Sequence, residues 1–343
     1  MKIGIICSLD KFANGIRPNR IKNYLEKKGH EVHLINTHHE QNKLSPFLRY
    51  IAKLYVKLPL KFKQFLLARQ FKIKGELIYN IIKDKNYNCI ICENPWDAYV
   101  LTKDLKAIKI YDSPSPWFDE LFYSRQISDR VFQKLKKLEL EIYHKVDYLC
   151  FHWDNYTRYV QKNTYNGKNM FIMNWGSDIK PPEKKAKYSY PPKVVFLGNL
   201  DGYWNNLPLL SQLAKQYTID VYGAPAPDKK YGLNYKGYAP STDVLSKYQF
   251  GLITITKDEL RKHSFSSKHI EYLSYGLPVL TPEWRDDPSL SQVSIPFNEH
   301  NFSAQIQKYS NRSSWERLSN MSYAKANSLS WEEVLKPLDK IIK

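Results

Sequence analysis

Cysteine is scarce in this 343-residue sequence. All four cysteines lie in apolar runs of the first half: Cys7, Cys89, Cys92 and Cys150. Thiols in buried strands are ordinary packing residues, so we expect no disulfide framework. The run Cys-Ile-Ile-Cys has the spacing of a redox or zinc motif, but three residues along a strand place its two thiols on opposite faces. We therefore expect no metal or redox site there.

Long apolar runs are also missing. No stretch approaches the roughly 18 to 20 continuous apolar residues of a membrane span. The first ten residues, MKIGIICSLD, have the pattern of a short buried strand and lack the longer apolar region of a signal peptide. We expect a cytoplasmic protein, either soluble or peripheral on the inner face of the membrane.

Acidic residues are absent from residues 43–74, which carry nine Lys or Arg. Arg49, Lys53 and Lys57 recur every four residues beside apolar side chains, which predicts a basic amphipathic helix broken near Pro59. Two interpretations stay open, a solvated face over the core and contact with an anionic membrane surface. The formal net charge of +18 is compatible with nucleic acid, but no nucleic-acid-binding motif accompanies it, so we expect no such partner.

Strand-like runs alternate with helical patterns along the whole chain, which predicts an α/β fold with parallel sheets. Residues 1–178 form one doubly wound domain in this interpretation. Four prolines cluster in residues 179–193, which we expect to be a linker. Residues 194–325 repeat the scheme as a second Rossmann-like domain. Residues 326–343 are expected to form a terminal helix that packs back toward the first domain.

The stretch SSKHIEYLSYGLPVLTP, residues 266–282, follows a predicted strand and begins a helix. The carboxyl ends of parallel strands are where ligands bind, and a helix N-terminus favours an anion such as phosphate. Lys268 lies in the first turn, and Glu271 lies three residues on, along the same helix face. A carboxylate there can accept hydrogen bonds from two neighbouring hydroxyls, as a ribose offers. The alternative is a solvated ion pair.

These residues resemble the donor-site segment of GT-B glycosyltransferases, particularly the family 4 type of bacterial surface-polysaccharide synthesis. The resemblance extends to VVFLGNLDGYWNN, DVYG, IYDSPSPWFDE and the terminal SWEE. It implies two Rossmann-like domains facing across a cleft, an N-terminal acceptor domain and a C-terminal domain for the nucleotide-sugar donor. It also implies that Glu271 holds the nucleotide ribose and that Lys268, beside Ser267, holds the diphosphate.

Further site residues follow from the resemblance and from local chemistry. Gly198 and Asn199 come directly after a predicted strand, where glycine allows the backbone to approach a diphosphate closely. Gly15 and Arg17 occupy the place of the family's glycine-containing first loop near the donor phosphate. His263 stands where many family 4 enzymes have a glutamate assigned to the donor sugar or to catalysis.

No Asp-x-Asp motif occurs, so we expect a metal-independent reaction without a cofactor beyond the UDP- or GDP-linked sugar. Lys268, Arg261 and the helix N-terminus would then stabilise the leaving diphosphate. A base for the acceptor hydroxyl should come from a strand end of the first domain. We rank Asp112 first and His152 second as catalytic candidates.

The leading interpretation is a glycosyltransferase that moves a sugar from a nucleotide donor to a glycan or a lipid-linked acceptor. The alternatives are a nucleotide-sugar epimerase on the same scaffold and a noncatalytic protein that binds a sugar nucleotide or a membrane.

Overall fold

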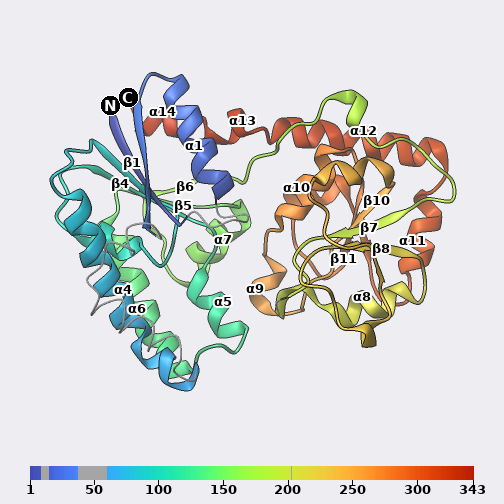
Figure 1. Ribbon diagram of the computed structural model, residues 1–343, viewed down its shortest axis with the longest axis horizontal. Helices are drawn as coiled ribbons and strands as arrows, with labels where there is room; N and C mark the ends of the chain where they lie inside the picture. Colours follow the sequence, from blue (N-terminus) through green and yellow to red (C-terminus); the bar gives the residue numbers. More distant parts are fainter. Residues whose placement is uncertain (9–14, 38–59, 202) are drawn as a thin grey trace. The chain divides into compact units, whose positions relative to one another are not determined.

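The computed structural model describes residues 1–8, 15–37, 60–201 and 203–343, and the chain divides into two compact units. The N-terminal unit comprises residues 1–175 and 334–343, and the C-terminal unit comprises residues 176–333. Each unit is built around one parallel sheet (Figure 1). Within the described ranges, no helix combines the length and apolar character needed to cross a bilayer.

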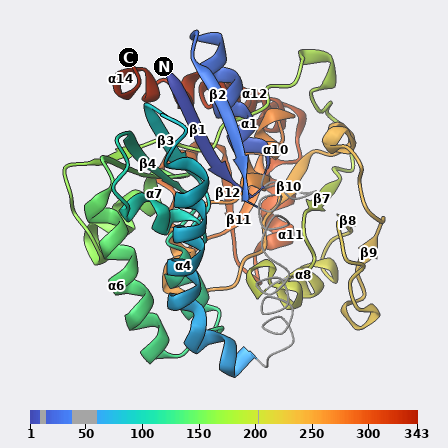
Figure 2. The ribbon, with the colours of Figure 1, turned by 60° about the vertical axis from the view of Figure 1, so that its left-hand side comes forward.

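The N-terminal sheet has six parallel strands in the order β2-β1-β3-β4-β5-β6. The strands are β1 (Lys2–Cys7), β2 (Glu31–Asn36), β3 (Cys89–Cys92), β4 (Ile108–Ser113), β5 (Tyr148–Phe151) and β6 (Met170–Ile172). Figure 2 shows β2, β1 and β3 next to one another. Central β3 is fully buried, whereas edge strand β2 exposes Glu31 and His33. This contrast is typical of a parallel sheet covered on both faces.

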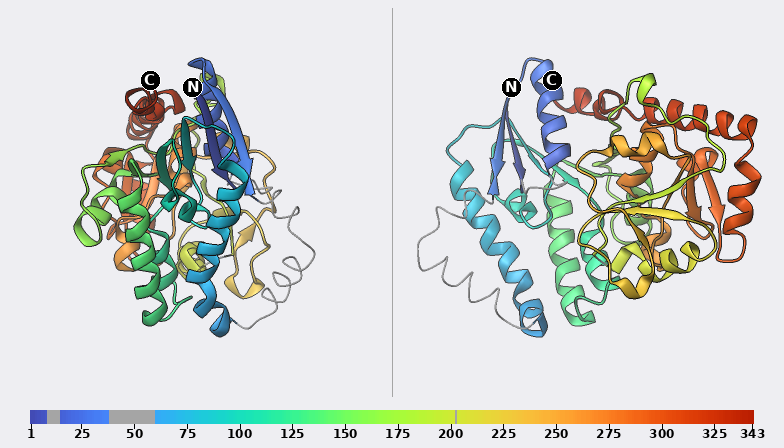
Figure 3. Two further views of the ribbon diagram at one scale, coloured as in Figure 1. Left: turned by 90° about the vertical axis from the view of Figure 1, so that its left-hand side faces the viewer. Right: turned by 45° about the vertical axis from the view of Figure 1, so that its right-hand side comes forward.

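Helices cover this sheet. They are α1 (Ile16–Lys27), α4 (Leu60–Ile82), the 3₁₀ helix η2 (Ala98–Thr102), α5 (Trp117–Tyr123), α6 (Asp129–Lys145) and α7 (Asp154–Asn163). Helices α4 and α6 pack side by side, as the cyan and green helices of Figure 3 show. Helix α4 begins directly after Pro59, where the sequence predicts a break. Residues 43–59, the first part of the predicted basic helix, lie outside the described residues.

The C-terminal sheet also has six parallel strands, in the order β12-β11-β10-β7-β8-β9. The strands are β7 (Val194–Leu197), β8 (Ile219–Tyr222), β9 (Asn234–Tyr235), β10 (Phe250–Leu252), β11 (Val279–Pro282) and β12 (Ser294–Phe297). The strand order reverses between β7 and β10, as in the doubly wound nucleotide-binding fold. In the N-terminal sheet it reverses between β1 and β3.

The helices of the C-terminal unit surround this sheet. They are η3 (Pro182–Lys184), η4 (Tyr203–Asn205), α8 (Leu207–Ala214), η5 (Lys229–Tyr231), η6 (Thr242–Lys247), α9 (Glu259–Lys262), α10 (Ser267–Ser274), η7 (Pro288–Val293), α11 (Phe302–Tyr309) and α12 (Arg312–Ser328). The boundary between the two units falls within α13 (Trp331–Leu335). Helix α10 packs against α12 (Figure 1). Segment 242–247 is a 3₁₀ helix, although the run STDVLSKY at residues 241–248 has the pattern of an ordinary helix.

Two boundary segments differ in detail from the sequence-based description. Residues 179–193, predicted to be a linker, belong to the C-terminal unit, where the Ala186 N–H donates to the Tyr275 carbonyl. The expected single terminal helix consists of α13 and α14 (Leu338–Ile341), because Pro337 lies between them. The last ten residues group with the N-terminal unit, where the Tyr24 hydroxyl donates to Asp339 at 2.9 Å.

Candidate functional site

The switch point of the C-terminal sheet brings together most of the residues expected to bind a donor. Gly198 and Asn199 directly follow β7. Helix α10, which follows β10 and the short helix α9, carries Ser267, Lys268 and Glu271. Ligands of doubly wound sheets bind at this place, beyond the carboxyl ends of the strands at which the order reverses. Residues 70 positions apart in the sequence thus share one edge of the sheet.

Tyr272 fixes α10 against the ends of both central strands. Its hydroxyl accepts the N–H of Leu197 at 2.9 Å and donates to the carbonyl of Leu252 at 3.3 Å. Its ring lies on Gly251, where an added Cβ would come within 2.4 Å of ring atoms. Because Tyr272 lies one turn after Lys268, this anchor also sets the position of the Lys268 side chain.

Gly198 makes room for Lys268. A Cβ at Gly198 would lie 2.0 Å from the Lys268 Cε, and a Cβ at Gly223 would lie 1.8 Å from the carbonyl oxygen of Gly198. The loops after β7 and β8 therefore touch through backbone atoms, and the lysine stem crosses the first of them. Any side chain at Gly198 would displace Lys268.

The Lys268 side chain is half-buried, and its ammonium lies against other side chains. Its Nζ donates to the Oδ1 of Asn205 at 2.7 Å and lies 4.8 Å from the centroid of the Phe196 ring. Burial lowers the pKa of Lys268 to about 8, although the charge of Glu271 opposes the shift. A second anionic group beside this ammonium, such as a diphosphate, would favour its charged form.

The Glu271 carboxylate is open to a ligand. The side chain is half-buried, and among the described residues no hydrogen-bond donor reaches its carboxylate oxygens. Burial raises the pKa of Glu271, while Lys268 and Lys180 oppose the shift and Asp178 adds to it. A half-buried carboxylate with open oxygens can accept hydrogen bonds from a pair of hydroxyls.

The remaining donor-site candidates lie close by in the sequence. Arg261, in α9, is buried, and its guanidinium lies 5.8 Å from the Trp204 ring centroid. His263 ends α9 and is half-buried. Ser267 is exposed at the start of α10, and the side chain of the preceding Ser266 makes no capping hydrogen bond. Asn199 is exposed and accepts the N–H of Asp201, which shapes the loop after β7.

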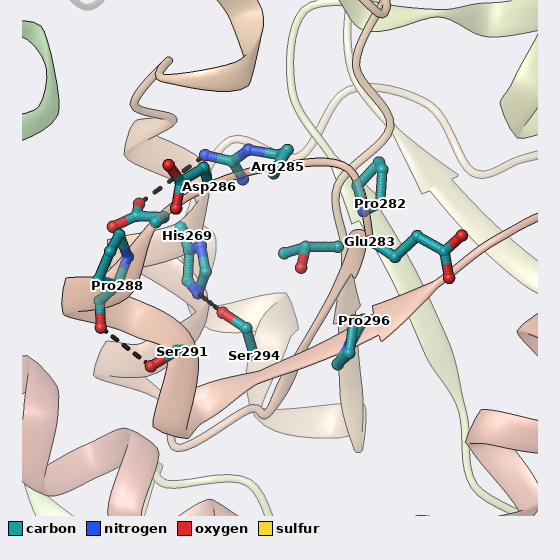
Figure 4. Close-up of a pocket in the computed structure, with 11 residues that line it drawn as sticks. His269, Pro282, Glu283, Arg285, Asp286, Pro288, Ser291, Ser294 and Pro296 are labelled. Atoms are coloured by element: carbon teal, nitrogen blue, oxygen red, sulfur yellow. Dashed lines mark hydrogen bonds and ion pairs between the residues drawn. The ribbon is translucent and has the colours of Figure 1, made fainter. Parts of the chain in front are cut away.

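A pocket of about 200 Å³ lies on another side of α10. His269 lines it, together with residues of the β11–β12 connection (Figure 4). Successive helix side chains project about 100° apart, so His269 faces away from Lys268 and Glu271. Its Nε2 lies 3.4 Å from the Ser294 hydroxyl. This pocket is separate from the expected donor residues.

In the N-terminal unit, Asp112 is held inside the protein. Arg17 binds both of its carboxylate oxygens, through Nε at 2.7 Å and Nη2 at 2.9 Å, and both side chains are fully buried. The Cys150 thiol also donates to Asp112, at 3.1 Å. Burial alone would raise the pKa of Asp112, but Arg17, together with His152 and the hydrogen bond from Cys150, outweighs burial and the pKa is lowered. This geometry favours a structural carboxylate over the acceptor base expected from the sequence.

Arg17 has a matching structural role. Besides Asp112, its guanidinium donates to the carbonyls of Met173 and Asn174, each at 2.8 Å. Four of its five N–H bonds are thus committed inside the unit, which argues against the phosphate contact expected from the resemblance. Gly15, the N-cap of α1, is half-buried.

His152 lies beside this ion pair, with Nε2 3.6 Å from Asp112, and only 3% of its side chain is exposed. Burial, with a further contribution from Arg17, lowers the pKa of His152 to about 3. The imidazole is therefore neutral at physiological pH, and the guanidinium alone balances Asp112.

Three residues at the switch points of the two sheets were not predicted from the sequence. Asn205 is buried and orients Lys268 from 63 residues away. Gly223 permits the contact between two loops. Glu93 follows the last residue of β3 with a half-buried side chain. A charged residue directly after a fully apolar strand was the available signal for Glu93.

Comparison with known proteins identifies the fold. No family model matches the sequence, and no curated protein matches it. Solved structures do: sucrose-phosphate synthase from Thermosynechococcus elongatus has 12% identity and a TM-score of 0.72, covering 99% of this chain and 98% of that one. Anabaena HepE in complex with UDP-glucose has 12% identity and a TM-score of 0.64, covering 100% and 99%. The lipopolysaccharide outer core galactosyltransferase WaaB has 11% identity and a TM-score of 0.61, with the same coverage. The chain has the GT-B fold of these glycosyltransferases over its full length.

Proposed function

We propose that this protein is a glycosyltransferase that moves a sugar from a UDP- or GDP-linked donor to a glycan or lipid-linked acceptor in bacterial surface-polysaccharide synthesis. The observation that carries the proposal is the pair Lys268 and Glu271 at the switch point of the C-terminal sheet. The ammonium suits a diphosphate, and the open carboxylate suits a ribose diol. Because Gly198 has no side chain, the Lys268 side chain can cross the loop after β7 at this edge of the sheet.

Three structures of one neighbour support the choice of donor. HepE structures contain UDP-glucose, UDP with glucose, or UDP alone. WaaB acts on lipopolysaccharide outer core as a galactosyltransferase, which agrees with the surface-polysaccharide part of the proposal. These ligands and activities belong to the neighbours, and the shared fold is the reason to test them here.

The test of this function has two stages. A thermal-shift panel with UDP, GDP and their sugars should raise the Tm of the protein, because a ligand that binds only the folded state stabilises it. Turnover with the stabilising donor should then transfer the sugar to an added glycan or lipid-linked acceptor. Isomerisation of the donor would instead indicate an epimerase, and stabilisation without turnover would indicate a binding protein.

We also propose that the reaction needs no metal ion. Lys268 and the N-terminus of α10 supply positive charge where a diphosphate would leave, and the sequence contains no Asp-x-Asp motif. Activity should therefore persist in EDTA. Loss of activity in EDTA with recovery on adding Mg²⁺ or Mn²⁺ would contradict this part of the proposal.

The acceptor side of the proposal includes an anionic membrane surface. On α4, the exposed side chains of Phe65, Leu66 and Ile73 lie beside exposed Arg69 and Lys72. These positions fall on one helical face at spacings of three, four and seven residues. Apolar side chains flanked by cations suit the interface of a bilayer with acidic headgroups.

A further inference from the structure

The switch point of the N-terminal sheet carries a carboxylate, that of Glu93, to which the proposed function gives no role. The order of this sheet reverses between β1 and β3, and Glu93 is the first residue after β3. Its N–H donates to the Ile6 carbonyl at 3.2 Å, so the backbone of Glu93 still pairs with β1. The side chain thus stands at the edge where a doubly wound sheet presents its ligand-binding groups.

Glu93 differs from the other acidic side chains at this edge. Asp112 is bound by Arg17 and Cys150. Asp97 accepts the Thr37 hydroxyl and pairs with Lys74 at 2.6 Å. The carboxylate of Glu93, by contrast, has no hydrogen-bond or ion-pair partner among the described residues, and its side chain is half-buried.

The charges around Glu93 do not balance. Three titratable groups interact electrostatically with it: Arg17 from α1, Asp112 from β4 and Cys7 from β1. The single guanidinium is already bound at both oxygens of Asp112, so two carboxylates share one cation. Burial raises the pKa of Glu93 well above its ordinary value, Asp112 adds to the shift, and Arg17 opposes it.

A half-buried carboxylate without partners destabilises a folded protein, so a purely structural explanation fits Glu93 poorly. Groups that reduce stability in this way are typical of binding sites. We propose that Glu93 is an acceptor-anchoring residue, whose two carboxylate oxygens accept hydrogen bonds from the hydroxyls of a neutral sugar. This assignment rests on the proposed glycosyltransferase function and names the substrate class that the N-terminal unit binds.

The experiment compares wild type with Glu93→Gln. Gln keeps the size and one oxygen acceptor of the side chain, but it removes the charge and replaces the second oxygen with a donor. The probes are the methyl glycosides of glucose, galactose, mannose and N-acetylglucosamine, and their binding is measured by ligand-observed NMR at pH 8. Wild type should bind at least one probe, and Glu93→Gln should weaken that binding about tenfold or more, as expected for a hydrogen bond to a charged group.

A matched control and a stability readout accompany the binding data. Glu76→Gln removes a carboxylate of the same unit that is exposed and paired with Lys103, and it should leave probe binding unchanged. Glu93→Gln should also raise the Tm of the protein at pH 8. Because the folded pKa is raised, this advantage should be absent below the unfolded pKa of about 4.3, should grow as the pH rises from there to the folded pKa, and should level off above it.

Each result decides the assignment. Failure of wild type to bind any of the four glycosides, equal binding by Glu93→Gln, or a Glu93→Gln protein that is less stable or unfolded at pH 8 would overturn it. In transfer assays, a fall in kcat with unchanged acceptor KM would replace anchoring with proton transfer. UDP binding is measured separately, so failure of the donor proposal is distinguishable from failure of this one.

Discussion

At the scale of single residues, the donor edge depends on two charged side chains in unequal surroundings. Lys268 is held by Asn205 and the Phe196 ring, whereas the Glu271 carboxylate has no partner within the described part of the chain. Burial lowers the pKa of Lys268 and raises the pKa of Glu271, so it favours the uncharged form of each side chain. Such opposed shifts in one edge of a sheet are more common in binding sites than on a solvated helix face.

The first prediction concerns Glu271. Glu271→Gln should weaken UDP binding by roughly 1.5 to 3 kcal/mol, because a charge-assisted hydrogen bond to the ribose is lost. Isothermal titration calorimetry with UDP measures this change. Glu316→Gln on the exposed surface of α12 is the control and should bind UDP like wild type. Unchanged affinity in Glu271→Gln would remove this carboxylate from the site.

The second prediction follows from the lowered pKa of Lys268. Since the folded pKa is about 8, the ammonium loses its proton as the pH rises through this value. UDP affinity should therefore fall between pH 7 and pH 9, by up to tenfold per pH unit above pH 8. Calorimetry at three pH values tests this. In Lys268→Met the affinity should be lower at pH 7 and this steep dependence should disappear; if it remained, another group would be responsible.

At the scale of elements, the pattern of apolar runs predicted most of the strands that the structure contains, but not β6 and β12. The apolar run at β6 is short and none of its three residues is fully buried, whereas the run at β12 is interrupted by Pro296. Residues 242–247 also differ from the expected ordinary helix, because they form a 3₁₀ helix. The Ser241 cap at its start is the same kind of cap that begins an ordinary helix, so the sequence does not distinguish the two.

Whether the role of a site residue could be predicted from the sequence depends on how far along the chain its partners lie. Lys268 and Glu271 stand in one short segment, so their shared face follows from helical spacing alone. The role of Asp112 depends on Arg17, 95 residues away, and that of Gly198 depends on the path of the Lys268 side chain. Local patterns contain no information about such partners. The sequence therefore predicts a strand-end aspartate but not its ion pair.

The third prediction concerns the elements that this ion pair joins, α1, β4 and the chain after β6. Asp112→Asn should leave the buried guanidinium of Arg17 without a counter-ion and should lower the free energy of unfolding by about 3–5 kcal/mol. Urea unfolding measures the loss. The double replacement of Arg17 by Met and Asp112 by Leu should recover part of it, because no unpaired charge remains. A stable Asp112→Asn protein with impaired turnover would restore Asp112 as the acceptor base.

At the scale of the whole molecule, the large positive charge is not spread evenly. The stretch from Lys43 to Lys74 holds nine of the 52 basic residues and no acidic one. Its second part forms the start of α4, where exposed apolar and basic side chains share a face. Net charge of this size can serve solubility alone, but exposed Phe65, Leu66 and Ile73 do not serve that purpose.

The fourth prediction distinguishes these explanations through vesicle binding. If α4 lies on an anionic bilayer, wild type should co-sediment with vesicles containing phosphatidylglycerol, and binding should weaken as salt screens the charges. Replacing Arg69 and Lys72 with Gln should weaken binding by about 2 kcal/mol, at about 1 kcal/mol per basic residue. UDP binding should be unchanged, because these residues lie outside the C-terminal unit.

The control for vesicle binding removes the same charge elsewhere. Lys215 and Lys247 are exposed in the C-terminal unit, and their replacement with Gln should leave co-sedimentation near the wild-type level. An equal loss in both double variants would mean that net charge, and not the α4 face, drives the attraction. If wild type ignores anionic vesicles even at low salt, the basic face is solvated or contacts a glycan. The acceptor then need not be lipid-linked, because nothing would hold the N-terminal unit at a bilayer.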